Sequence, residues 1–91
     1  MHYMIIYDIS DNNLRLLISE TLKDYGLKRI QKSAFMGILQ KHSLNLLLTD
    51  LRRMITVDSI IVFCICDLDF RNIIPIGKML VEETENEVEF N

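Results

Sequence analysis

The sequence predicts one small α+β domain. Short runs of branched and aromatic residues, typical of buried strands, alternate with longer segments whose leucines and isoleucines recur at helical spacing. The chain has 91 residues, which suffices for one domain over residues 1–91 and is too few for two. Hydrophobic residues make up 49% of the chain, a large share for so small a body. This composition favours either a dense core or a permanent oligomer.

The first two elements are a strand over residues 3–7 and a helix over residues 12–25. The strand reads YMIIY, an apolar run rich in aromatic and branched residues. Either Ser10 or Asp11 can cap the helix, because each side-chain oxygen can accept from a free amide of the first turn. Gly26 suits the left-handed conformation that often follows a helix. The apolar stripe of this helix consists of Leu14, Leu17, Ile18, Leu22 and Tyr25.

Two strands and a second helix follow. Residues 27–30 and 34–39 predict the strands, with Gly37 as a candidate bend or bulge. Ser43 is the expected cap of the helix. Its stripe consists of Leu44, Leu47, Leu48, Leu51 and Ile55.

The last part of the chain contains the strongest strand signal, SIIVFCI over residues 59–65. Residues 67–72 are polar and predict a turn. Residues 73–76 predict a further strand at an edge, because Pro75 cannot donate to a sheet ladder. Val88 and Phe90 alternate with glutamates, so residues 80–91 are either an acidic tail or a final strand. The order strand, helix, strand, strand, helix, strand is that of ferredoxin-like folds, which host many functions.

The charges are unevenly placed along the chain. The net charge is −3, which argues against binding to nucleic acid by bulk positive charge. The first half nevertheless carries a group of bases that could form one basic face: Lys23, Lys28, Arg29, Lys32 and Lys41. No apolar stretch has the length of a signal peptide core or a membrane span, so we expect no membrane contact and a cytoplasmic location.

Cys64 and Cys66 are the two cysteines of the chain. No histidine lies near them in sequence, so a zinc site is not expected. They are predicted to be buried, reduced thiols.

Asp8 is the first candidate functional residue. It follows a buried strand directly, so it lies at the rim of the sheet, where an acid near a helix start can be purely structural. Its other reading is a ligand for a hard cation such as Mg²⁺, which often takes only one or two carboxylates. One such acid per chain is a poor site, whereas two brought together by a twofold axis are a reasonable one. Asp11 is more simply a cap, and Asp67 and Asp69 suit a turn.

The candidate phosphate contacts are arginines. Arg15 lies one position off the helical stripe, and Arg29 lies in the second strand on the face opposite to Lys28 and Lys32. A solvated surface accounts for both arginines, and so does contact with phosphate. No Ser-His-Asp arrangement, glycine-rich phosphate loop or HExxH motif is found, so an enzyme here would depend on a carboxylate and a metal.

Four features recur in order along the first forty residues: the run YDISD over residues 7–11, Arg15, YGL over residues 25–27, and RIQKSAFMG over residues 29–37, which contains RxQxSxF and a trailing glycine. With these features the chain resembles the CRISPR-associated Cas2 family over about its first forty residues. Leu17 stands where many relatives carry a second arginine, which removes a possible phosphate contact. Ala34 stands where valine is commoner, a modest change in packing volume.

This resemblance implies a ferredoxin-like homodimer in which the last strand of each subunit extends the partner's sheet. It implies that the Asp8 residues of the two subunits face each other and bind one divalent metal, usually Mg²⁺. It also implies a metal-dependent endonuclease on RNA or DNA that acts in spacer acquisition with the Cas1 integrase. The positions linked to activity or substrate contact are Tyr7, Arg15, Arg29, Ser33 and Phe35.

Three hypotheses follow. The first is a metal-dependent phosphodiesterase with Asp8 as the catalytic metal ligand. The second is a non-catalytic dimeric scaffold that binds duplex DNA and spaces two integrase units, with Asp8 serving only the fold. The third, an RNA nuclease toxin of the VapD type, fits the RxQxSxF run less well.

Overall fold

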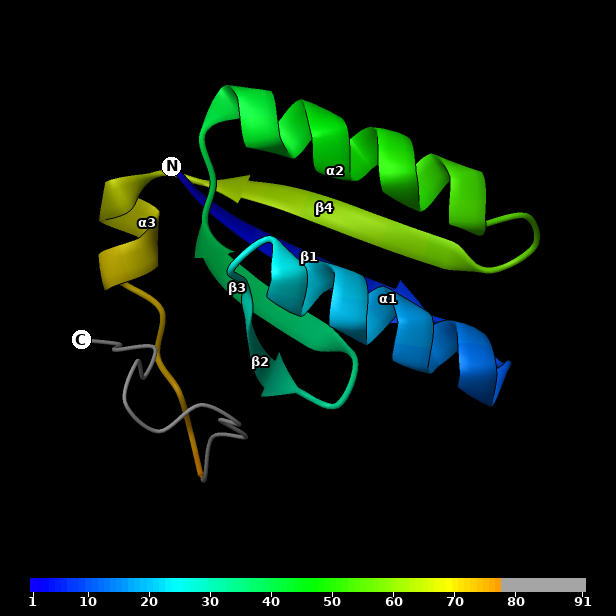
Figure 1. Cartoon of the computed structure of the whole chain (residues 1–91). Coiled ribbons are helices and arrows are strands. Elements are labelled where there is room, and N and C mark those ends of the chain that lie inside the picture. The colour runs from blue at the N-terminus through cyan, green and yellow to red at the C-terminus, as the bar shows by residue number, and fades with distance from the viewer. Residues whose placement is uncertain (78–91) are drawn as a thin grey trace.

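The computed structural model describes residues 1–77 of the chain. Its strands pair antiparallel throughout, in the order β2-β3-β1-β4, and α1 and α2 lie on one face of the sheet (Figure 1). This is the ferredoxin-like arrangement that the sequence predicted. The described elements are β1 (His2–Asp8), α1 (Asn12–Asp24), β2 (Lys28–Gln31), β3 (Ala34–Ile38), α2 (Lys41–Met54), β4 (Ser59–Ile65) and α3 (Asp67–Arg71).

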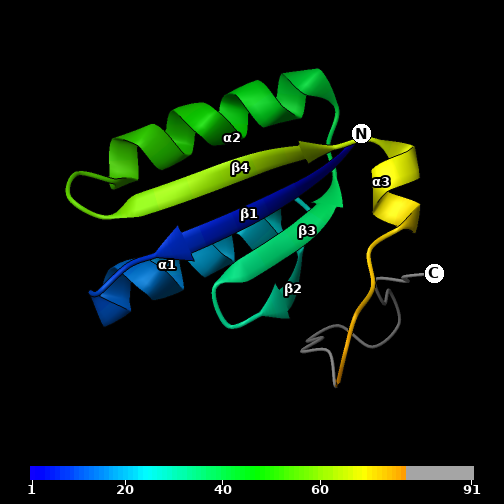
Figure 2. The same ribbon diagram turned by 180° about the vertical axis from the view of Figure 1, so that it is seen from behind.

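β1 is an inner strand and has a neighbour on each side. Successive side chains of a strand point to opposite faces of the sheet. Tyr3, Ile5 and Tyr7 are 8%, 0% and 4% exposed and pack toward the helices, whereas Asp8 is exposed and lies on the other side. Figure 2 shows the sheet from that other side, which we call the open face. The open face carries Met4, Ile6 and Asp8 of β1 with their β4 partners Phe63, Ile61 and Ser59.

The main core fills the space between the sheet and the two long helices. Its fully buried side chains come from both helices and from two strands, so the core joins segments far apart in sequence. Full burial of such a side chain contributes about 1.5–3 kcal/mol to folding. These side chains are Ile5, Ile18, Leu22, Phe35 and Leu47.

Both ends of α1 have residues that the sequence predicted there. The amide of Leu14 donates to Oδ2 of Asp11 at 2.7 Å, so Asp11 is the cap. Gly26 follows the helix with a φ of +89°, which only glycine adopts easily. Leu17 was expected in the buried stripe, but it is 47% exposed because it lies at the edge of the face that packs on the sheet.

The second helix begins earlier than predicted. α2 starts at Lys41, with Gln40 as a cap that makes no side-chain hydrogen bond, and Ser43 lies inside the first turn. Leu39 is buried directly after β3, which turns the chain into the helix before Ser43 is reached. The amide of Leu44 accordingly donates to the carbonyl of Gln40 at 2.9 Å.

An irregularity occurs in β2 and not at Gly37. Arg29 pairs with Phe35 and Gln31 pairs with Ala34, which leaves one extra residue, Ile30, on the β2 side. Such a bulge bends a strand and redirects its side chains. The strict alternation expected over residues 28–32 is therefore wrong.

Gly37 has a different role from the one predicted. It pairs in regular register with Tyr3. A Cβ at this position would lie 2.8 Å from Cδ2 and 3.3 Å from Cα of Leu27. Gly37 therefore permits the close approach of two chain segments.

The region after β4 differs from the prediction. Residues 67–71 form the short helix α3, where a turn was expected, and residues 73–76 form no strand. Pro75 lacks an amide hydrogen, and the amide of Ile73 donates to the carbonyl of Phe70 at 3.2 Å, so Ile73 closes the last turn of α3 instead of pairing with a strand. The acidic segment 80–91, with Val88 and Phe90, lies outside the described residues.

The two thiols are free, as predicted, but both are exposed. Cys64 lies on β4, the outer strand of the described sheet. Cys66 lies beyond that strand, where its Sγ accepts from the amide of Asp69 at 3.5 Å. The position of β4 at the edge of the sheet explains why these cysteines are not covered within one chain.

The open face keeps a large apolar surface in contact with solvent. Ile6, Ile38, Ile61 and Phe63 are 38%, 66%, 54% and 41% exposed. Contiguous apolar patches of this kind mark interaction sites more often than free surface. No helix within residues 1–77 is both long enough and apolar enough to span a bilayer.

Candidate nucleic-acid and metal site

A cavity of about 440 Å³ opens between α1 and the β2–β3 hairpin, on the helix side of the sheet. Four of the predicted site residues line it: Tyr7, Arg15, Arg29 and Ser33. We call this cavity, with its further lining residue Lys32, the cationic groove. Three cations that converge on a concave surface can hold a phosphate, because guanidinium and ammonium groups donate directly to phosphate oxygens.

Sequence reasoning missed Lys32 as a groove residue and placed it on the face opposite to Arg29. The bulge at Ile30 alters the alternation, so Arg29 and Lys32 line the same cavity. Leu16 and Ser19 of α1 complete the lining. The bulge has no clear signature in the sequence, although the neighbouring Lys32 and Ser33 occupy the turn of the hairpin.

The hairpin turn is fixed to the end of β1 by Tyr7. The amide of Tyr7 donates to the carbonyl of Ser33 at 3.0 Å, and its hydroxyl donates to the carbonyl of Lys32 at 3.5 Å. Tyr7 thereby sets the position of the two turn residues relative to α1.

Phe35 contacts two residues of the cationic groove from the core side. It is 0% exposed, so its ring acts through its neighbours. The guanidinium carbon of Arg29 lies 5.1 Å from the centre of the Phe35 ring, and the Tyr7 ring lies 6.3 Å from it at an interplanar angle of 29°. An arginine over an aromatic face is attracted by about 0.5–2 kcal/mol, depending on its exposure to water. Phe35 therefore holds Arg29 and Tyr7 in place.

Asp8 occupies the same end of the sheet as the groove but the opposite face. Tyr7 and Asp8 are neighbours in β1, so their side chains point to opposite sides. In the loop that follows Asp8, the amide and the hydroxyl of Ser10 donate to Oδ1 of Asp58 at 3.4 and 3.5 Å. These contacts join the β1–α1 loop to the residue before β4.

At this end of the sheet, Asp58 accepts from Ser10 and Asp11 caps α1, so Asp8 is the candidate carboxylate for a metal ion. Residues 1–77 contain no cluster of three or more His, Cys, Asp or Glu side chains suited to a metal. Asp8 is exposed and offers the oxygen atoms that Mg²⁺ prefers, but one carboxylate with water is an incomplete protein site. The donor chemistry therefore fits Mg²⁺ only if a second carboxylate joins Asp8.

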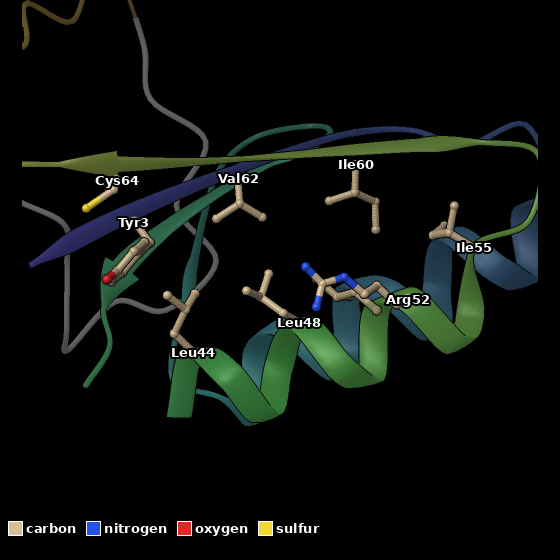
Figure 3. A pocket seen from close by; sticks show the side chains of 9 residues that line it. Tyr3, Leu44, Leu48, Arg52, Ile55, Ile60, Val62 and Cys64 are labelled. Carbon is tan, nitrogen blue, oxygen red and sulfur yellow. The ribbon is translucent and has the colours of Figure 1, made fainter. Parts of the chain in front are cut away.

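A second concave surface lies between α2 and β4, with a volume of about 570 Å³. Figure 3 shows Leu44 and Leu48 of α2 facing Val62 and Ile60 of β4, with Arg52 extending into the space between them. We call this surface the edge groove. Tyr3 and Cys64 lie at one end of it, and burial, with a lesser part from the hydrogen bond to Cys64, raises the pKa of Tyr3 above its ordinary value.

The chain is similar to known proteins. The family model described as "CRISPR associated protein Cas2" matches residues 1–73. The chain belongs to the Cas2 family. A relative from Korarchaeum cryptofilum, named "CRISPR-associated endoribonuclease Cas2", is 44% identical over 77 residues, which cover 82% of this chain and 83% of the relative. The family predicted from YDISD and RxQxSxF is thus confirmed.

A second relative joins two Cas proteins in one chain. It is the "CRISPR-associated endonuclease Cas1/endonuclease Cas2 fusion" of Thermoproteus tenax, 44% identical over 39 residues, which cover 43% of this chain and 15% of the relative. In that protein a Cas2 unit is covalently linked to Cas1.

Two solved structures confirm the fold of the chain. The structure of Cas2 from Streptococcus pyogenes superposes with a TM-score of 0.75 at 20% identity, covering 85% of this chain and all of that chain. The hypothetical protein TT1823 from Thermus thermophilus gives the same TM-score at 27% identity, covering 89% of this chain and 96% of that one.

Proposed function

We propose that this chain is a Mg²⁺-dependent endonuclease that cleaves single-stranded RNA, duplex DNA or both, and that it acts in spacer acquisition with the Cas1 integrase. The observation that carries the proposal is the cationic groove, which lies at the same end of the sheet as Asp8. The 44% identity to a relative named as an endoribonuclease supports the activity, and the Cas1/Cas2 fusion supports the partner. Reduced thiols at Cys64 and Cys66 suit a cytoplasmic location.

In this proposal the metal site is shared by two subunits. A homodimer that pairs the open faces would bury Ile61 and Phe63 and bring the two Asp8 carboxylates together. Such carboxylates would hold Mg²⁺, which lowers the pKa of a bound water and stabilises charge on a phosphate. The exposed apolar area beside Asp8 supports the dimer, because permanent interfaces resemble a core cut in half.

The groove residues hold the nucleic-acid backbone in this proposal. Arg15, Arg29 and Lys32 contact phosphate oxygens, and the hydroxyl groups of Ser33 and Tyr7 supply further polar contacts. These groups neutralise the backbone and fix its position relative to the end of the sheet. Phe35 assists by holding the Arg29 guanidinium.

The edge groove is the proposed receptor for the partner's last strand. The outer strand β4 offers backbone groups for one more strand, and the apolar lining would cover Val88 and Phe90 of the partner.

Cleavage and metal dependence are tested together. The purified protein is incubated with single-stranded RNA and with duplex DNA, in Mg²⁺ or EDTA, beside Asp8→Asn and the matched control Asp24→Asn. Asp24 is an exposed acid at the far end of α1. We expect cleavage by the wild type and the Asp24 variant in Mg²⁺, and none by the Asp8 variant. Cleavage by folded Asp8→Asn would refute the proposed role of Asp8, and light scattering at micromolar concentration tests the dimer.

A non-catalytic scaffold is the second candidate function. It is favoured by the separation of Asp8 and the groove on opposite faces, since DNA could bind the groove without approaching the carboxylate. In this case the wild type would bind duplex DNA and Cas1 stably but cleave neither substrate, and Asp8→Asn would bind equally well. Arg29→Gln would weaken binding under both functions, so cleavage is the measurement that separates them.

A further inference from the structure

The outer face of α2 is exposed and positively charged, and we call it the α2 face. Its residues are Lys41, His42, Asn45, Leu46, Thr49, Arg52 and Arg53. None of these residues is acidic. The carboxylate of α2 belongs to Asp50, which is half-buried and accepts a hydrogen bond from the hydroxyl of Tyr25 at 2.8 Å. The exposed charge of this helix is therefore all of one sign.

The charge of the α2 face is concentrated at its two ends. Lys41 is the first residue of α2 and Arg53 lies in its last turn, so at 1.5 Å per residue they are about 18 Å apart along the helix axis. Neither makes an ion pair within residues 1–77. Arg52 adds charge near Arg53, although its side chain extends into the edge groove (Figure 3). The face therefore attracts anionic groups at two separated points.

The fold accounts for one of these two cations but not for the other. Arg53 is favoured where it lies, because a cation near the C-terminus of a helix is attracted by the helix dipole. Lys41 has the opposite position. It lies in the first turn, which the dipole makes unfavourable for a cation, and there no acidic residue compensates it and Gln40 makes no side-chain cap. An anion bound to the α2 face would remove this repulsion.

We propose that the α2 face binds the backbone of duplex DNA, in a contact separate from the cationic groove. A length of 18 Å along α2 corresponds to about five base-pair steps, over which both strands of a duplex present phosphates. A rigid helix with a cation at each end suits such a rigid row of charges. The contact needs neither Asp8 nor a metal ion.

The composition of the α2 face favours duplex DNA over other partners. Protein–DNA interfaces are polar and positively charged. The centre of a protein–protein interface is more apolar, and Leu46 is the one exposed apolar residue of this face. Proteins bind single strands largely by stacking bases on aromatic side chains, and the face contains no Phe, Tyr or Trp. Contact with phosphates of a duplex requires neither feature.

The α2 face and the cationic groove lie on different sides of α1. α2 lies beside β4, whereas the groove opens between α1 and the β2–β3 hairpin (Figure 1). The bases expected to form one face are thus divided, with Arg29 and Lys32 in the groove and Lys41 on α2. The exposed acids Glu20 and Asp24 of α1 oppose a backbone that crosses this helix. Both surfaces belong to the helix side of the sheet, so a homodimer that pairs the open faces leaves them accessible.

The test measures the affinity of the full chain for a short labelled DNA duplex in EDTA, by fluorescence anisotropy over a range of salt concentrations. Lys41→Gln and Arg53→Gln should each weaken binding about three- to ten-fold and reduce the slope of log affinity against log salt by about 0.9, the value for one phosphate contact. Lys23→Gln is the matched control, because Lys23 is an exposed lysine of α1 beside Asp24. It should leave the affinity and the slope unchanged.

Thermal unfolding separates a loss of binding from a loss of stability. Lys41→Gln removes a cation that the helix dipole repels, so its unfolding midpoint should equal or exceed that of the wild type while its affinity for DNA decreases. Wild-type affinity in both α2 variants, or an equal loss in Lys23→Gln, would overturn the proposal. The proposal would also be wrong if the α2 variants bound DNA normally but lost binding to the Cas1 integrase, since the face would then bind a protein.

The result is independent of the proposed nuclease activity. Absence of cleavage in Mg²⁺, together with weaker DNA binding by Lys41→Gln and Arg53→Gln, would support the α2 contact and refute the endonuclease. Weaker binding by Arg29→Gln alone would support the groove and refute the α2 contact.

Discussion

The guanidinium carbon of Arg29 lies 5.1 Å from the centre of the buried Phe35 ring. The two residues are direct partners across the β2–β3 hairpin. The Phe35 side chain is buried in the core, and the face of its ring lies against the guanidinium of Arg29, one of the cations of the cationic groove. The position of a proposed phosphate contact is thus set by the packing of the domain.

The first prediction concerns Phe35→Leu. A leucine keeps most of the apolar contact but offers no aromatic face, so Arg29 is held less firmly. We expect the variant to fold and to bind single-stranded RNA or duplex DNA several-fold more weakly, measured by fluorescence anisotropy. Phe35→Ala would remove about 3–5 kcal/mol of unfolding free energy, too large a loss for a clear binding measurement.

The control for Phe35→Leu is Leu47→Val, which alters the core beneath α2, away from the groove. It should lower the free energy of unfolding by about 0.5–1.5 kcal/mol, like other single-methyl deletions, and leave the affinity unchanged. Wild-type affinity in Phe35→Leu would show that Arg29 needs no aromatic support.

The second prediction concerns the salt dependence of binding. If Arg15 and Arg29 each neutralise one phosphate, Arg15→Gln and Arg29→Gln should each reduce the slope of log affinity against log salt by about 0.7–0.9. Arg71→Gln, on α3 at the other end of the sheet, should leave the slope unchanged. A reduced slope for Arg71→Gln but not for Arg29→Gln would place the nucleic acid elsewhere.

Local chemistry made much of this fold predictable. The Asp11 cap and the glycine after α1 depend on a few neighbouring atoms, so the sequence indicated where α1 begins and ends. Arg15 and Arg29 were candidate phosphate contacts from the sequence itself. Tyr7 and Ser33 were named only through family resemblance, since a pattern alone does not bring α1 and the hairpin together.

Features set by tertiary packing were not predictable in this way. Burial of Leu39 decides the start of α2, and the bulge at Ile30 decides the face of Lys32. α3 carries no apolar stripe and depends on the stack between His2 and Phe70, which are 68 positions apart in the numbering. Each of these outcomes depends on contacts between distant segments.

The third prediction is a pH effect at Tyr25. Its hydroxyl donates to Oδ2 of Asp50 at 2.8 Å and joins α1 to α2. This hydrogen bond, then burial, then the charge of Asp50 raise the pKa of Tyr25 above its ordinary value of 10.0. The folded state therefore favours the neutral phenol, so the stabilisation is complete below about pH 10 and is lost as the pH rises through the raised pKa.

Thermal unfolding of the wild type and Tyr25→Phe checks this sign. We expect a lower midpoint for the variant at pH 7, a constant gap up to about pH 10, and a smaller gap above it. In the Asp50→Asn background that decrease should be smaller and should end closer to pH 10, because the pKa of Tyr25 is then raised less. A gap that stays constant through the alkaline range would contradict the assignment.

The fourth prediction compares two glycines. Gly26→Ala forces a φ of +89° on a residue with a side chain, while nothing lies within 4 Å of the added carbon. The cost is thus conformational, about 1 kcal/mol of unfolding free energy. Gly37→Ala instead meets Cδ2 of Leu27 at 2.8 Å and its Cα at 3.3 Å, and overpacking of this kind costs about 1–3 kcal/mol.

A double-mutant cycle separates the two contacts that Gly37→Ala makes. Leu27→Ala alone leaves a cavity in the core, whereas Leu27→Ala in the Gly37→Ala background also removes the close contact at Cδ2. We therefore expect the double variant to lose at least about 0.5 kcal/mol less unfolding free energy than the sum of the single variants, measured by denaturant titration. Additive losses would mean that the backbone contact at Cα of Leu27 sets the limit, and that β3 and the segment after Gly26 are held apart by main-chain atoms alone.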